Sequence, residues 1–132
     1  MEPTRWLAVI ALLGLPGVAF GGWALLTYIT GREGLSPAQQ RFFRDGHAHA
    51  GVLLVLSLVY VSYLDDTGFS EGLQWAAGLT LFAGVTAQSS GFFLHMAAVD
   101  TSSPSAGTKL TRAGALLIGA ALVALAIGLI VA

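Results

Sequence analysis

Four long, predominantly apolar stretches account for most of the 132 residues of this chain, and only short polar segments separate them. The hydrocarbon core of a bilayer is roughly 30 Å thick, and a helix needs about 20 apolar residues to cross it. Little sequence remains outside these stretches for a separate soluble domain. The sequence therefore predicts one all-α domain over residues 1–132, an integral membrane four-helix bundle with antiparallel, up-down topology.

The expected spans cover residues 6–29, 45–63, 72–99 and 110–131. In the first span, Pro16 predicts a kink, because proline removes a helical hydrogen bond. Ser36 and Pro37 have the pattern of an N-cap followed by proline at the first helical position, so we expect a short helical turn along the membrane interface before the second span. The link around Asp65 is short, which favours antiparallel packing of the spans it joins.

Composition excludes several classes of function. The chain is 55% hydrophobic and 10% charged, with a formal net charge of −1 and no run of like charges, so it lacks the basic surface that nucleic acid requires. It has no cysteine, which excludes disulfides, iron–sulfur clusters and thiolate-ligated haem. Histidine is then the strong metal ligand that remains.

The distribution of basic residues predicts the orientation. Five of the six basic residues fall in or beside the first and third links: Arg32, Arg41, Arg44, Lys109 and Arg112. Basic residues are retained on the cytoplasmic side of a membrane. We therefore expect loops 1 and 3 to be cytoplasmic and both termini to be non-cytoplasmic, in a plasma membrane of the bacterial inner-membrane type.

Three histidines, His47, His49 and His95, fall in or near the apolar spans. Ionisable residues are costly there and usually line a cavity, bind a cofactor or relay protons. The expected spans place His49 and His95 at matching depth, roughly 6 Å from the same interface at about 1.5 Å per residue. His47 and His49 point roughly 200° apart on a regular helix and cannot chelate one metal together, unless the helix begins only after His47. We assign His47 to the membrane interface.

Neighbouring residues distinguish His49 and His95 further. Asp45 lies four residues before His49, so its carboxylate is placed to accept the imidazole N–H and orient the ring. In the third span, Gln88, Gly91 and His95 form a polar or small stripe, which should face protein rather than lipid.

Two short motifs resemble a known family. The run RDGHAHAG at residues 44–51 opens the second span, and SSGFFL at residues 89–94 comes late in the third. Together they resemble the styrene oxide isomerases, which are small four-helix membrane enzymes. The resemblance implies a homotrimer that holds haem b near the protomer interfaces, with one histidine of the second helix on the iron. The family's His-Ser-Gly matches residues 49–51 with Ala50 in place of the serine, so the ligand role falls to His49. We expect Asp45 to support it and Gly91 to lie beside the cofactor.

The family rearranges an aryl epoxide to an aldehyde without net redox change, using ferric haem as a Lewis acid. The resemblance makes Ser89, Phe92 and Phe93 the candidates for the substrate pocket, where a phenyl face stabilises developing positive charge. Besides Ala50, the chain departs from the family pattern at three positions. Ser89 and Val55 replace asparagines, and Phe93 replaces a tyrosine, so the phenolic hydrogen-bond donor is lost.

Two other functions remain open. If His95 is a sixth ligand, the iron is bis-histidine coordinated, which suits an electron carrier like the membrane cytochromes b and opposes substrate binding. Without haem, the chain is a small accessory membrane subunit whose histidines serve packing or proton movement.

Overall fold

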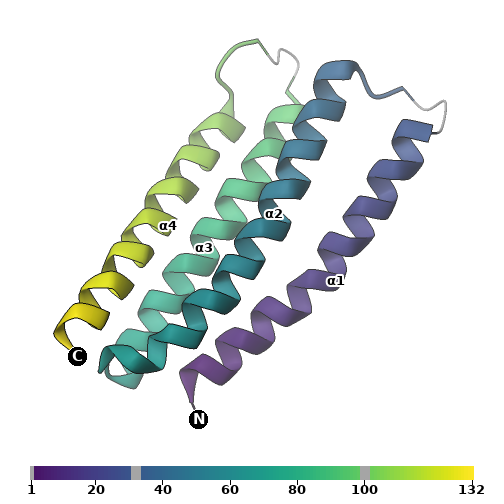
Figure 1. The fold of residues 1–132 in the computed structure, drawn as a ribbon. Helices are drawn as coiled ribbons and strands as arrows, with labels where there is room; N and C mark the ends of the chain where they lie inside the picture. Colours follow the sequence, from purple (N-terminus) through teal and green to yellow (C-terminus); the bar gives the residue numbers. More distant parts are fainter. Residues whose placement is uncertain (1, 31–33, 99–101) are drawn as a thin grey trace.

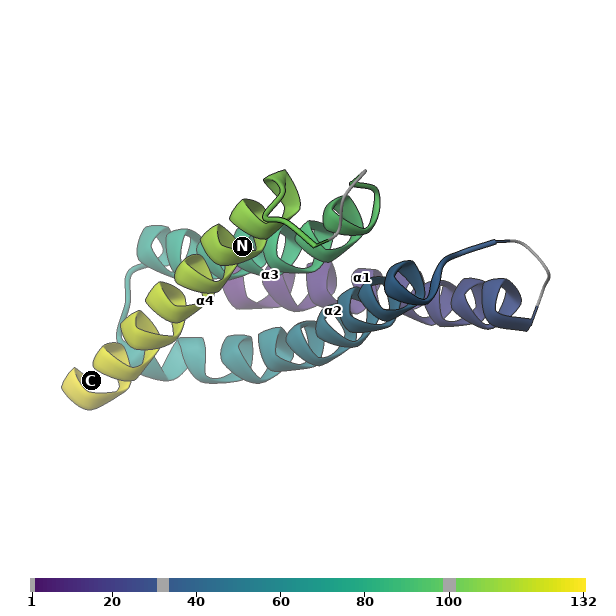
Figure 2. The same ribbon diagram turned by 90° about the horizontal axis from the view of Figure 1, so that it is seen from above.

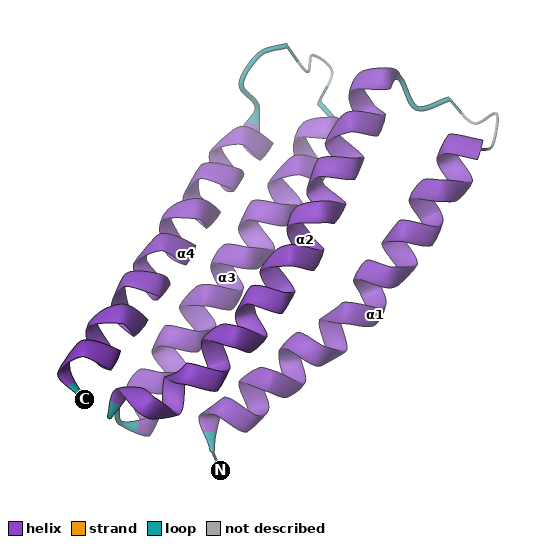
Figure 3. Cartoon of the chain, viewed as in Figure 1, coloured by secondary structure: helices purple, strands orange, loops and turns teal. Residues whose placement is uncertain are grey.

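The computed structural model describes residues 2–30, 34–98 and 102–132, and it is helical almost throughout (Figure 3). The elements are α1 (Pro3–Thr30), α2 (Pro37–Leu64), a 3-10 turn η1 (Asp65–Thr67), α3 (Glu71–Met96) and α4 (Ala106–Val131). Each of these four α-helices is long and apolar enough to cross a membrane. The predicted all-α class, the four helices and their suitability as membrane spans are confirmed.

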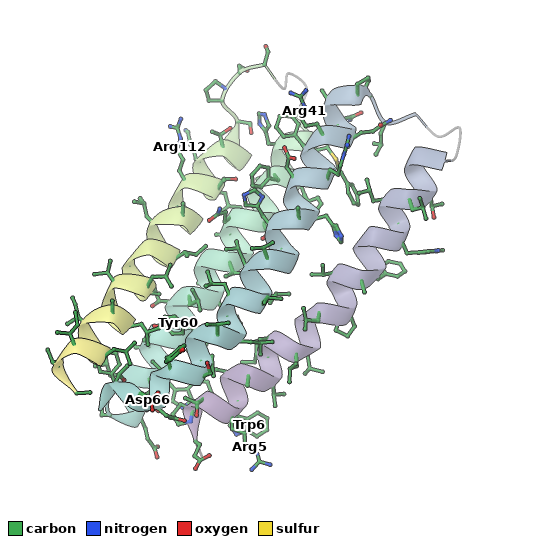
Figure 4. The ribbon with its side chains drawn as sticks, viewed as in Figure 1. Arg5, Trp6, Arg41, Tyr60, Asp66 and Arg112 are labelled. Atoms are coloured by element: carbon green, nitrogen blue, oxygen red, sulfur yellow. The ribbon has the colours of Figure 1, made fainter. Side chains whose placement is uncertain are left out.

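The helices form a bundle in which α3 packs against both α4 and α2, and α1 packs mainly against α2. The helices α1 and α4 lie on opposite flanks (Figures 1 and 2). Both ends of the chain lie at one end of the bundle (Figure 1). Arg5 and Asp66 lie at that same end, whereas Arg41 and Arg112 lie at the other (Figure 4).

The second helix begins earlier than the sequence predicts. Ser36 caps it as expected: its Oγ accepts from Gln39 N at 3.3 Å, Gln39 Oε1 accepts from Ser36 N at 2.9 Å, and Pro37 is the first helical residue. The expected interfacial turn is wrong as a separate element, because the helix continues from Pro37 into the span without a break. Nothing between Pro37 and Asp45 interrupts the backbone ladder, since proline comes only at the first position, where no donor is needed.

The remaining bounds differ by fewer residues. The fourth helix starts at Ala106 rather than at residue 110, because Ser105 supplies the cap by accepting from Gly107 N at 3.1 Å. The third starts at Glu71 and is helical to Met96, and its expected end at Val99 lies outside the described residues. Pro16 lies inside α1, whose axis bends near its middle in Figure 1.

The buried core lies toward the end of the bundle that holds both termini. Its hydrophobic members are Leu7, Tyr60, Val61, Leu64, Ala77, Leu81, Val85, Ile118, Ala121 and Leu125. At the same end the Asp65 carboxylate accepts from Thr4 Oγ1 at 3.0 Å and from Gln74 Nε2 at 3.4 Å. Thr4 and Gln74 are both buried, so these bonds tie α1 to the α2–α3 junction.

Glycines bring α3 and α4 into backbone contact. A methyl group at Gly84 would lie 2.9 Å from the Gly114 carbonyl oxygen, and one at Gly107 would overlap Gly91 O and His95 N. Gly114 is equally close to α3, where a Cβ atom would overlap Gln88 N, whereas Gly119 faces open space. Small residues thus set how closely these helices pack, as is common in membranes.

The hydrogen bond of Tyr60 in the core can be tested by substitution. The Tyr60 ring is 1% exposed, and its hydroxyl donates to Ala121 O at 3.2 Å, joining α2 to α4. We expect Tyr60→Phe to lower the free energy of unfolding by about 1 kcal/mol, because one buried hydrogen bond is lost. Unfolding in detergent followed by circular dichroism measures this. Tyr63→Phe is the control, since Tyr63 is 51% exposed; equal effects of the two changes would contradict the assignment.

Candidate functional site

The two sequence motifs, residues 44–51 and 89–94, meet where α2 and α3 approach each other at Gly46. A Cβ atom at Gly46 would lie 2.9 Å from Phe92 Cβ and 3.2 Å from Phe93 Cε2. This contact separates two groups of side chains. Phe92 lies on the side toward α4 and Phe93 on the side toward α1, as their neighbours show.

His49 lies on the α4 side of this contact. Its Nδ1 is 2.8 Å from the main-chain oxygen of Asp45, and its ring packs on Phe92 with centroids 4.7 Å apart. A carbonyl oxygen only accepts, so Nδ1 carries the proton and Nε2 of the neutral ring keeps its lone pair. The sequence predicts the Asp45 carboxylate as the partner. The carbonyl takes this place, because in a continuous helix it lies one turn behind the imidazole.

His95 lies on the same side but at a different depth. Its Nδ1 is 2.7 Å from Ser105 Oγ, and its ring meets Phe42 edge to face at 4.5 Å. Phe42 precedes His49 by seven residues of the same helix, or about 10 Å along its axis. The expected matching depth is therefore wrong. It assumed a helix start at Asp45, whereas α2 starts at Pro37 and carries His49 twelve residues inward.

His47 lies on the α1 side, where its ring packs against two glycines. A Cβ atom at Gly21 would lie 3.2 Å from His47 Nδ1, and one at Gly22 would lie 3.2 Å from Nε2. The ring also lines a cavity of about 450 Å³ between α1, α2 and α3, here called the three-helix cavity. The sequence assigns His47 to the membrane interface, but the ring lies between helices. Its divergence from His49 follows the predicted helical geometry.

The structure divides the predicted site residues between the two sides. Ser89 and Phe93 line the three-helix cavity with His47, and Phe93 meets Phe43 edge to face at 5.4 Å. His49 and Phe92 lie on the other side of Gly46. Val55 is 53% exposed on the outer surface of α2.

The stripe of Gln88, Gly91 and His95 faces protein, as predicted, and its partner is α4. Thr111 Oγ1 donates to Gln88 O at 3.4 Å, and a Cβ atom at Gly91 would overlap Thr111 Oγ1. Gly91, expected beside the cofactor, thus lies against α4, which occupies the space that its missing side chain leaves.

Sequence reasoning missed the three-helix cavity. The signal that could have found it is the spacing of Gly14, Gly17 and Gly21, which all line the cavity from α1. Such glycines more often mark helix packing. At Gly17 a Cβ atom would meet nothing within 4 Å, so packing does not account for that position.

The donor atoms restrict which metal group would fit. Within residues 2–30, 34–98 and 102–132, no three His, Cys, Asp or Glu side chains gather to hold a metal ion. One neutral imidazole with its Nδ1 anchored fits a metal whose other ligands come with it, as the porphyrin nitrogens do in haem. His49 meets this requirement.

Comparison with known proteins yields no match to a family model, to a curated protein or to a solved structure. The resemblance to the styrene oxide isomerases therefore rests on the two motifs and on the number of helices.

Proposed function

We propose that the protein is a membrane haem b protein in which His49 is the only axial ligand that the chain supplies. The observation that carries this proposal is the 2.8 Å contact between His49 Nδ1 and Asp45 O. Metal-ligating histidines almost always donate their second nitrogen in this way, which fixes the tautomer and the ring orientation. Packing on Phe92 restricts the ring further.

The surroundings of His49 support a cofactor between copies of the chain. His49 is half-buried, and it lines neither the three-helix cavity nor the cavity beside His95. A haem on its Nε2 would lie against the flank of the bundle, where apolar side chains such as Val52 are exposed. A second copy would cover its other face, which agrees with the homotrimer that the resemblance implies.

For the reaction, we propose the redox-neutral isomerisation of an aryl epoxide to an aldehyde. Bound ferric haem supplies Lewis acidity toward the epoxide oxygen. The residues of the chain provide an apolar environment that excludes water and so prevents diol formation. Phe92 packs on the His49 ring, so it would support that ring on the ligand's side of a bound haem and is not assigned to the substrate. Ser89 and Phe93 point to the other side of Gly46 and are not assigned to this substrate.

The position of His95 does not favour the electron-carrier alternative. Two axial nitrogens lie roughly 4 Å apart across a metal, at about 2.0 Å per metal–nitrogen bond. His95 is bonded to Ser105 and packs about two helical turns from His49 along α2. We therefore propose an open sixth position.

We propose an antiparallel bundle in a bacterial inner membrane, with loops 1 and 3 in the cytoplasm. The argument is the separation of charge, since Arg41 and Arg112 share one end of the bundle and Asp66 lies at the other (Figure 4). A reporter fused to the C-terminus that is active only outside the cytoplasm should then be active. An inactive reporter, with a cytoplasmic reporter active at the same position, would reverse the orientation.

The proposed function is tested by spectroscopy and product analysis. Protein purified with haem available should show a high-spin ferric Soret band that shifts with azide or imidazole. Incubation with styrene oxide should yield phenylacetaldehyde by gas chromatography. Low-spin bis-histidine bands would favour the electron carrier, and absence of a Soret band would favour the accessory subunit. A high-spin haem without product would leave haem binding intact and reject this substrate.

A further inference from the structure

The three-helix cavity is a second site, separated from His49 by the contact at Gly46. Its volume of about 450 Å³ falls in the usual range for pockets that hold small molecules. One end is apolar, with Ile10, Leu54 and Phe82, and the other carries the polar side chains of His47, Ser89 and Ser90. A ligand would therefore be oriented along the cavity.

Ser89 is the strongest indication that something binds there. Ser89 is 8% exposed, and its buried Oγ has no hydrogen-bond partner within the described part of the chain. Other helical hydroxyls bond to their own backbone, as Ser57 Oγ does with Leu53 O at 2.8 Å and Thr80 Oγ1 with Ala76 O at 2.7 Å. Buried polar groups in native proteins are rarely left unpaired, and each exception calls for an explanation. Ser89 lines the cavity, so rotation about its Cα–Cβ bond would bring this hydroxyl to a ligand acceptor there.

His47 supplies the second polar group at the same level of the bundle. Phe43 packs on Phe93, and one turn further into the membrane these helices carry His47 and Ser89 respectively. No hydrogen bond joins the His47 ring to any residue of the described segments. Gly21 and Gly22 leave room for the ring beside α1. A neutral imidazole offers one N–H donor.

The charge of the lining restricts the class of ligand. The cavity is lined by no Lys, Arg, Asp or Glu among the described residues. An ion bound there would be buried without a partner, which is costly. A carbonyl oxygen is neutral and has two lone pairs, enough to accept from both the Ser89 hydroxyl and the His47 N–H.

We propose that the three-helix cavity binds a neutral, lipophilic carbonyl compound, whose oxygen lies at His47 and Ser89 and whose apolar body extends toward Leu54. This site is additional to the proposed haem site and does not depend on it. Labelling of the cavity should therefore be the same in the wild-type protein and in His49→Ala.

Photolabelling with benzophenone tests the proposal, because this neutral ketone is both ligand and crosslinker. Irradiation of membranes containing the full chain should modify cavity residues such as Leu54 or Val85, located by mass spectrometry. Acetophenone should compete, and ethylbenzene, which lacks the carbonyl, should compete about tenfold more weakly, as the loss of hydrogen bonds to the ligand implies. Equal competition would overturn recognition of the oxygen.

Variants distinguish labelling inside the three-helix cavity from labelling of the lipid-facing surface. Ser89→Ala should weaken labelling about tenfold through loss of a hydrogen bond. Ser57→Ala is the matched control, because this buried serine is paired within its helix and lies outside the cavity. Gly17→Leu should fill the cavity and abolish labelling. Persistent labelling in Gly17→Leu, or an unchanged Ser89→Ala, would overturn the proposal. If Gly17→Leu does not fold, Ala50→Leu fills the cavity from α2 and is judged by the same criterion.

Discussion

Replacing His49 with alanine is expected to abolish stoichiometric haem binding. The imidazole is the only strong ligand that the proposed site takes from the chain, and alanine leaves no donor in its place. The Nδ1 contact to Asp45 O requires His49 Nδ1 to donate, which leaves the Nε2 lone pair available, whereas the Ser105 hydroxyl beside His95 can donate or accept. The ratio of Soret absorbance to protein, measured after purification with haem available, should fall to the background of the expression host.

Three control variants give this prediction its specificity. His47→Ala and His95→Ala should keep stoichiometric haem, because His47 faces the three-helix cavity and His95 bonds to Ser105. Asp45→Asn should also keep it, because the partner of His49 is a main-chain oxygen. If the Asp45 carboxylate oriented the ring, the same change would weaken binding by about 10- to 100-fold. Loss of haem in His47→Ala with retention in His49→Ala would reassign the ligand.

A large loss of stability is expected from Gly114→Ala, in the middle of the α3–α4 contact. The added methyl group would overlap the backbone nitrogen of Gln88 and lie 2.7 Å from the oxygen of Gly84. These are backbone atoms, so no side chain can rotate away, and α3 and α4 must separate. We expect the free energy of unfolding to fall by about 3 kcal/mol, the upper part of the usual range for overpacking. Unfolding of the purified protein in mixed micelles, followed by circular dichroism, measures this.

Gly119→Ala is the matched control on the same helix. A Cβ atom at Gly119 meets nothing within 4 Å. This change should leave stability unchanged or raise it by up to about 1 kcal/mol, because alanine is the better helix former. Similar losses from both substitutions would mean that helix packing in the membrane does not depend on the contact at Gly114.

Much of the architecture could be predicted because bilayer thickness and helical rise impose simple rules on composition. Four apolar stretches give four helices, and a serine before proline gives the helical start capped by Ser36, although not its continuity with the second span. Helical angles also predict that His47 and His49 diverge, and that the stripe containing Gly91 faces protein. These inferences need only one helix at a time.

The arrangement of the site residues could not be predicted from the periodicity of a single helix. His49 lies about two helical turns from His95 along the bundle axis rather than level with it, because α2 begins at Pro37 and not at Asp45. The hydrogen-bond partner of His49 belongs to Asp45, as predicted, but the accepting atom is the main-chain oxygen and not the carboxylate. Local spacing brings both oxygens of Asp45 within reach, and it does not decide which one the imidazole meets.

By itself, the sequence determined the class of fold, the number of helices, the absence of cysteine chemistry and the three histidines that carry the functional question. Tertiary structure alone decided which face each histidine meets, because that depends on where two helices touch. The contact at Gly46 sends His49 and Phe92 to one side and His47, Ser89 and Phe93 to the other. Helical periodicity fixes the angles between residues of one helix, but only packing between helices fixes their partners.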